Sequence, residues 1–98
     1  MADPAGPAGT APFRACMRAF LDGRLEPGEF SRVFFDLART SSGLGREPYL
    51  LLNRGMHLAE SYTDRPDQVG GGLIGADELR AGVAEVAAEL DALEGRAP

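Results

Sequence analysis

Hydrophobic residues recur along this chain at the three- and four-residue spacing of amphipathic helices. The first two predicted helices span residues 12–22 and 27–39, and Gly23 ends the first of them. Pro27 suits the first helical position of the second, because the N–H that proline lacks has no partner there. Their apolar positions are Phe13, Cys16, Met17, Phe20 and Leu21 in the first helix and Phe30, Val33, Phe34, Leu37 and Ala38 in the second.

Two further helices are predicted in the second half of the chain. Residues 48–62 place one apolar face on a helix, although Gly55 in its middle costs about 1 kcal/mol relative to alanine. Residues 76–94 alternate apolar steps of four and three, as a coiled-coil seam does, and Gly95 ends the helix. The seam consists of Leu79, Val83, Val86, Leu90 and Leu93.

The remaining segments carry turn-forming and helix-breaking residues. Residues 1–11 have almost nothing to bury and predict a disordered tail, while a proline and three consecutive glycines predict an irregular, mobile loop over residues 63–74. No segment alternates with a period of two, so strands are not expected. The predicted fold is all-α, an antiparallel four-helix bundle forming one domain over residues 12–95.

Length and charge limit the function. The 98 residues fit one domain, and their net charge of -5 is concentrated in the second half. Residues 1–46 carry six arginines and five acids, whereas residues 47–98 carry four arginines and ten acids. This distribution argues against nucleic acid or an anionic membrane as the partner and suits a basic protein. With no signal peptide or membrane span expected and a single cysteine, we expect a cytoplasmic protein.

Few residues are available for chemistry. One histidine and one cysteine cannot form a metal site of the usual kind, so no metal or cofactor is expected. Cys16 lies on an apolar helix face and predicts a buried, inert thiol, and His57 predicts a residue on a helix flank. The three glycines lack the strand, spacing and lysine of a phosphate loop. We therefore expect a protein that is not an enzyme.

Two groups of acidic residues are the most informative polar feature. On the last helix, three glutamates lie within about 40° of one another, and a second group lies where the third helix meets the glycine-rich loop. Either group can be a solvated surface or an anionic patch that speeds association with a basic protein. The candidate contacts are Glu78, Glu85 and Glu89, the second group Glu60, Asp64 and Asp67, and Tyr62 as an aromatic anchor.

Several short motifs resemble the colicin D immunity-protein-like family. They are AFLDGRL at residues 19–25 followed by EF and FFDL, then LLNR at 51–54, ESY at 60–62 and IGADELR at 74–80. The resemblance implies a bacterial four-helix bundle that inhibits a ribonuclease toxin. It also implies that acidic residues occupy the basic cleft where the toxin would bind RNA.

The leading prediction is a non-enzymatic binding protein that neutralises a basic toxin or ribonuclease domain through an acidic face. Its first contacts are Glu60, Asp64 and Asp67. The alternative is a self-associating or accessory helical subunit of a larger assembly with no inhibitory role. The seam of the last helix favours this alternative, and a homodimer is left open.

Overall fold

The computed structural model describes residues 9–41 and 43–95. Its helices are α2 (Ala11–Leu21), α3 (Pro27–Thr40), α4 (Arg46–Ser61) and α5 (Ala76–Gly95), with a short 3₁₀ helix, η1 (Pro66–Gln68), between the last two. Each of the four α-helices begins and ends within two residues of its predicted span.

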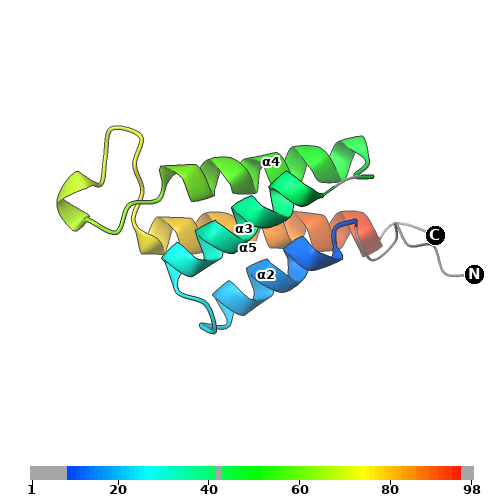
Figure 1. Ribbon diagram of the computed structural model, residues 1–98, viewed down its shortest axis with the longest axis horizontal. Coiled ribbons are helices and arrows are strands. Elements are labelled where there is room, and N and C mark those ends of the chain that lie inside the picture. The colour runs from blue at the N-terminus through cyan, green and yellow to red at the C-terminus, as the bar shows by residue number, and fades with distance from the viewer. Residues whose placement is uncertain (1–8, 42, 96–98) are drawn as a thin grey trace, which may run out of the picture.

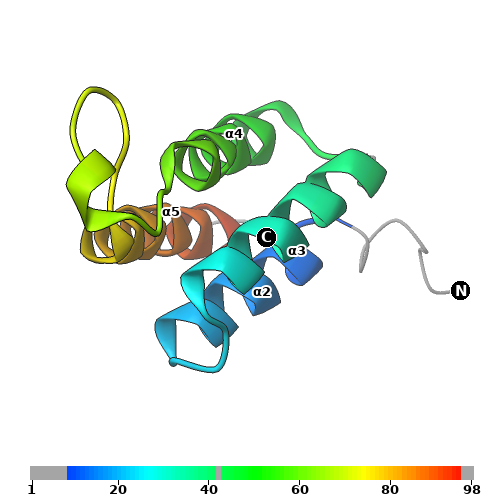
Figure 2. The same ribbon diagram turned by 60° about the vertical axis from the view of Figure 1, so that its left-hand side comes forward.

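The four helices form a ring in which each packs against two neighbours. Along the chain α2, α3, α4 and α5 alternate in direction, so consecutive helices are antiparallel, and α5 closes the ring against α2 (Figures 1 and 2). The described residues contain no strand, only isolated bridges in the loop before α5. The predicted all-α, antiparallel four-helix bundle is confirmed.

The predicted tail lies mostly outside the described residues, but its last residues belong to the fold. Thr10 is buried, and its hydroxyl donates a hydrogen bond to Glu94 Oε2 at 3.0 Å, near the end of α5. Helix α2 begins at Ala11. The prediction of a tail reaching residue 11 is therefore wrong at residues 10 and 11, because Thr10 is buried and its hydrogen-bond partner lies far away in the sequence.

Four phenylalanines from α2 and α3 form the centre of the core. Phe20 and Phe30 stack at 4.6 Å between ring centroids, and Phe34 contacts both Phe13 at 5.3 Å and Phe30 at 5.4 Å. The other fully buried side chains are Met17, Leu79, Val83, Val86 and Leu90. Contact between aromatic rings adds to the stabilisation from burying their surface.

Gly55 allows α4 to approach this aromatic core. A Cβ atom at Gly55 would lie 2.7 Å from Cζ of Phe34, closer than side chains pack. Because the Phe34 ring is fully buried, it has little room to move. The glycine that weakens the helix as an isolated segment is thus required for the contact between α3 and α4.

Arg80 connects α5 to the end of α2. Its Nη1 donates hydrogen bonds to the carbonyl oxygens of Phe20 at 2.9 Å and Leu21 at 3.2 Å, and its guanidinium lies 4.6 Å from the Phe20 ring centroid. Carbonyls in the last turn of a helix lack partners within the helix, and a positive charge there is favourable. Nothing in the local sequence pattern predicts this contact.

The apolar seam of α5 faces the interior of the bundle. Leu79, Val83, Val86 and Leu90 are each 0% exposed, and Leu93 is half-buried against the same core. The seam therefore packs within the chain and offers no surface to a second copy. The observation that favoured the self-associating alternative no longer supports it.

The loop between α4 and α5 has more structure than predicted. Besides η1, it contains a tight turn in which the N–H and carbonyl groups of Gly70 and Leu73 bond to each other at 2.9 and 3.1 Å. The amide of Ile74 donates a hydrogen bond to the carbonyl oxygen of Ser61 at 2.9 Å, and the amide of Thr63 donates one to the carbonyl oxygen of Ile74 at 2.9 Å. These bonds join the two ends of the loop at its base.

Candidate partner-binding surface

One end of the molecule combines most of the predicted contacts with two exposed apolar side chains. Because α4 and α5 are antiparallel neighbours, the last turn of α4, the loop and the first turn of α5 lie together at this end, beyond which the loop projects (Figure 1). We call it the loop-end surface, which consists of Glu60, Asp64, Arg65, Asp67, Val69, Leu73 and Glu78, all of them exposed.

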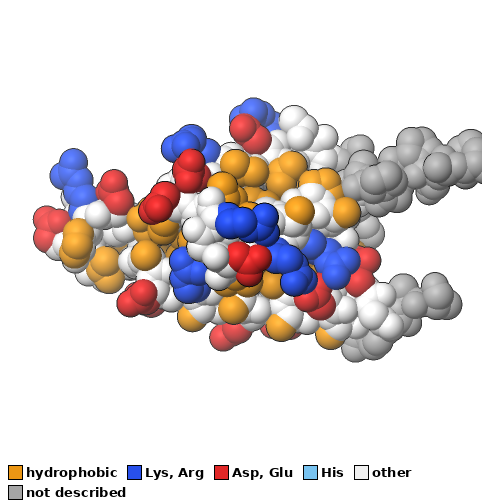
Figure 3. Space-filling model, turned by 90° about the horizontal axis from the view of Figure 1, so that it is seen from below, with side chains coloured by type: hydrophobic (Ala, Val, Ile, Leu, Met, Phe, Trp, Pro, Cys, Tyr) orange, Lys and Arg blue, Asp and Glu red, His pale blue; other side chains and the backbone are white. Residues whose placement is uncertain are grey.

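Val69 and Leu73 were missed in the sequence analysis. They are 44% and 37% exposed, and they flank three glycines that all have positive φ angles. Glycine adopts such angles without strain, so the tight turn holds the two side chains on either side of its tip. Figure 3 shows hydrophobic side chains between acidic ones at this end, on the left. The signal in the sequence was a pair of apolar residues enclosing a glycine run.

The carboxylates of the loop-end surface are largely uncompensated. Asp64, Asp67 and Glu78 form no ion pair with any residue of the described ranges. The Oε1 atom of Glu60 lies 3.6 Å from His57 Nδ1, and His57 is charged only when protonated. With Arg65 as the single arginine of the surface, four carboxylates face one fixed positive charge.

The other two predicted glutamates have an arginine partner. Glu89 Oε2 lies 2.9 Å from Arg54 Nη1, and Glu85 Oε1 lies 3.6 Å from Arg54 Nη2, so one arginine of α4 binds both. These contacts are at the surface, where ion pairs add little to stability. They nevertheless reduce the negative charge that this part of α5 offers to a partner.

Tyr62 is half-buried and belongs partly to the core. It packs against the core cluster, and it forms an isolated parallel bridge with Ile74 at the base of the loop. Tyr62 therefore connects the base of the loop to the core. Val69 and Leu73 are the more exposed apolar residues at this end.

Helix electrostatics distinguish two of the acidic residues. Glu78 lies in the first turn of α5, where the partial positive charge of the helix end favours a carboxylate. Glu60 lies in the last turn of α4, which contains no basic residue and where a carboxylate is unfavourable. Helix stability thus accounts for Glu78 but not for Glu60.

The one cysteine of the chain lies in the core of the bundle. Cys16 is buried, as predicted, and desolvation raises the pKa of its thiol to about 11, so the nucleophilic thiolate does not form near neutral pH. Among the described residues, no group of three or more His, Cys, Asp or Glu side chains lies close enough to hold a metal ion. None of the helices described is both long and apolar enough to cross a bilayer.

Comparisons with protein-family models, curated proteins and solved structures gave no match to this chain.

Proposed function

We propose that this chain is a non-enzymatic binding protein that neutralises a basic toxin or ribonuclease domain through the loop-end surface. The observation that carries the proposal is an exposed apolar pair, Val69 and Leu73, at the same end of the molecule as carboxylates without arginine partners among the described residues. Protein interfaces commonly have an apolar centre and a polar rim. A negative rim favours a partner with a basic cleft.

The resemblance to colicin D immunity-like proteins supports the same proposal. It implies that carboxylates take the place of RNA phosphates in a toxin's basic cleft. The position of Glu60 in the last turn of α4 is consistent with this role, because that carboxylate is unfavourable for the helix that carries it.

The decisive experiment is protection from toxicity. Each basic ribonuclease toxin domain encoded in the source genome is expressed with and without the chain, and growth and RNA cleavage are measured. We expect the chain to restore growth against at least one of these domains and to block its RNA cleavage in purified form. If the chain protects against none of these domains, the proposal is contradicted.

Charge reversal tests the surface once a protected domain is identified. The variant Glu60→Lys/Asp64→Lys should lose protection while keeping its helical circular dichroism. The matched variant Asp36→Lys/Glu47→Lys changes the net charge equally with two exposed acids outside the loop-end surface, and it should still protect.

A further inference from the structure

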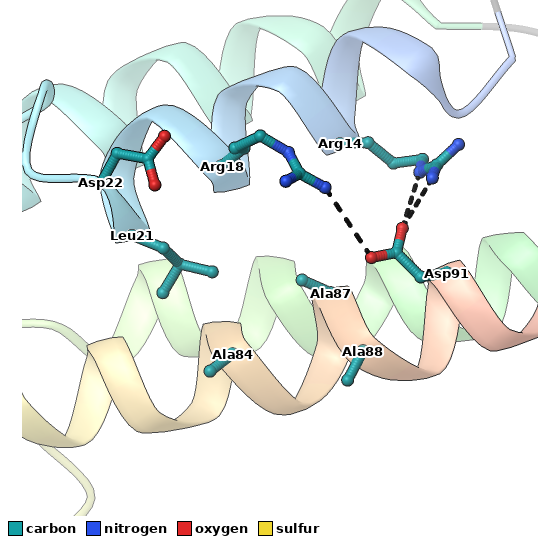
Figure 4. Close-up of a pocket in the computed structure, with 8 residues that line it drawn as sticks. All are labelled: Arg14, Arg18, Leu21, Asp22, Ala84, Ala87, Ala88 and Asp91. Atoms are coloured by element: carbon teal, nitrogen blue, oxygen red, sulfur yellow. Dashed lines mark hydrogen bonds and ion pairs between the residues drawn. The ribbon is translucent and has the colours of Figure 1, made fainter.

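A groove lies between α2 and α5, away from the loop-end surface, and has a volume of about 250 Å³. Figure 4 shows that the two arginines on its α2 wall extend toward Asp91 on α5. The lining residues are Arg14, Arg18, Leu21 and Asp22 from α2 and Ala84, Ala87, Ala88 and Asp91 from α5.

The α2 side of α5 carries excess positive charge, because Asp22 lies 3.2 Å from Arg24 Nη2 and only Asp91 remains for the other two arginines. Arg14 Nη2 lies 2.7 Å from Asp91 Oδ1, and Arg18 Nη2 lies 3.9 Å from Asp91 Oδ2, so two arginines share one carboxylate. The side chain of Arg18 is 65% exposed. Its guanidinium is therefore accessible to a partner.

The α4 side of α5 carries the opposite excess. There Glu85 and Glu89 share the single arginine Arg54, at 3.6 and 2.9 Å. The side chains of Glu85 and Glu89 are 71% and 52% exposed. The two sides of one helix thus differ in sign and are both open to solvent.

Beyond Asp77 in its first turn, the outer surface of α5 between these two sides carries only short side chains and can receive another helix. At about 100° per residue, Ala81 and Ala88 lie at its centre, Ala84 lies toward α2 and Ala92 toward α4. All four alanines are exposed. Short side chains permit helix axes to approach near the lower end of the usual 8–10 Å range.

We propose that a second copy of this chain binds along the groove and the outer face of α5, related by a two-fold axis parallel to α5. Such an axis makes the two α5 helices parallel and places the arginine side of each against the glutamate side of the other. A two-fold axis perpendicular to α5 in the interface would make the helices antiparallel and would bring like charges together. The charge pattern therefore selects the parallel arrangement.

The heights of the charges along α5 agree with this symmetry. Arg18 reaches Asp91, and Glu89 precedes Asp91 by two residues, which is about 3 Å along the helix. A rotation axis parallel to α5 leaves heights unchanged, so Arg18 of one copy meets Glu89 of the other, twice per dimer. The same symmetry places both loop-end surfaces at one end of the dimer.

Reversing and then swapping the charges tests this arrangement. Sedimentation of the full chain should show a concentration-dependent dimer, and Arg18→Glu or Glu89→Arg alone should weaken it about tenfold, because the axis repeats each contact. The double variant should restore the dimer by exchanging the two charges. Arg32→Glu, at an exposed arginine of α3, makes the same charge change and should have no effect.

A monomer at every concentration would overturn the proposal, as would a dimer that the double variant fails to restore. Circular dichroism of each variant measures its helix content and so distinguishes loss of the dimer from unfolding of the chain. Because the proposal does not depend on the function proposed above, protection against a toxin by a strictly monomeric chain would overturn only the dimer.

Cross-linking distinguishes the orientation of the helices. In the parallel pair identical residues face each other along the whole of α5, so Ala81→Cys and Ala92→Cys should each form a disulfide-linked dimer under mild oxidation. The two positions are eleven residues, or about 16 Å, apart, and an antiparallel pair cannot bring both together with their own copies. Cross-linking at only one position, or at neither, would overturn the parallel arrangement.

Discussion

The contact between α2 and α5 and the loop-end surface are both rich in charged residues, yet they use them differently. Between α2 and α5, Arg80 binds the last carbonyls of α2, Arg14 pairs with Asp91, and Thr10 donates to Glu94. At the loop end, Asp64, Asp67 and Glu78 have no arginine partner within the described residues. The first region uses polar groups to hold helices together, whereas the second leaves its carboxylates available to a partner.

This difference shows that charge alone does not identify a binding surface. Glu85 and Glu89 were predicted, with Glu78, as a second group of contacts beside the loop carboxylates, because the three lie on one face of a single helix. In the folded chain they share Arg54, which comes from another helix. The carboxylates without such a partner are the better candidates for binding.

The largest effect is expected at Arg80, in the region where polar groups support the fold. Arg80→Met removes the donor to two carbonyls at the end of α2 and should lower the free energy of unfolding by about 2–3 kcal/mol in urea denaturation. Arg18→Met, which removes the same charge from an exposed arginine nearby, should cost less than about 0.5 kcal/mol. Equal losses of unfolding free energy in the two variants would contradict the distinction between a structural and an exposed arginine.

Sequence periodicity was sufficient to predict the helices and most of the buried faces of α2, α3 and α5, because those depend on local spacing. The prediction was wrong at Val33, which was placed on the apolar face of α3 and is 39% exposed. Periodicity could not reveal the role of Arg80, whose acceptors lie about sixty positions earlier in the chain. Nor could it show that Gly55 makes room for Phe34, which is a contact between two helices. At the loop end it identified the acids but missed Val69 and Leu73, because their exposure depends on backbone bonds that close the loop.

The buried thiol of Cys16 in α2 should make the stability of the chain fall at high pH. The thiol of Cys16 has a pKa of about 11 in the folded chain, raised by burial from its ordinary value of 9.0, so between these values the unfolded chain loses its proton first. Deprotonation then favours unfolding, and stability should fall by about 2–3 kcal/mol as the pH rises from 9 to 11. Subtracting the profile of Cys16→Ala should isolate this fall. An identical slope in both proteins would contradict it.

The smallest effects are expected at the loop end, and their signs are informative. Glu60→Lys should raise the free energy of unfolding by about 0.5 kcal/mol, because it replaces a carboxylate in the last turn of α4. Glu78→Lys makes the same charge change in the first turn of α5 and should lower stability by a similar amount. Thermal denaturation at low salt compares the stabilities of the two variants. A loss of stability in both would show that Glu60 has a structural role.

The most direct test of the central claim is the affinity of the purified chain for the toxin domain against which it protects. Isothermal titration at low and high salt compares Glu60→Lys/Asp64→Lys with the control Asp36→Lys/Glu47→Lys. We predict that the loop-end variant binds about a hundredfold more weakly and loses most of its salt dependence, whereas the control binds like the unmodified chain. Equal affinities for the two variants would contradict the assignment of the loop end as the binding surface.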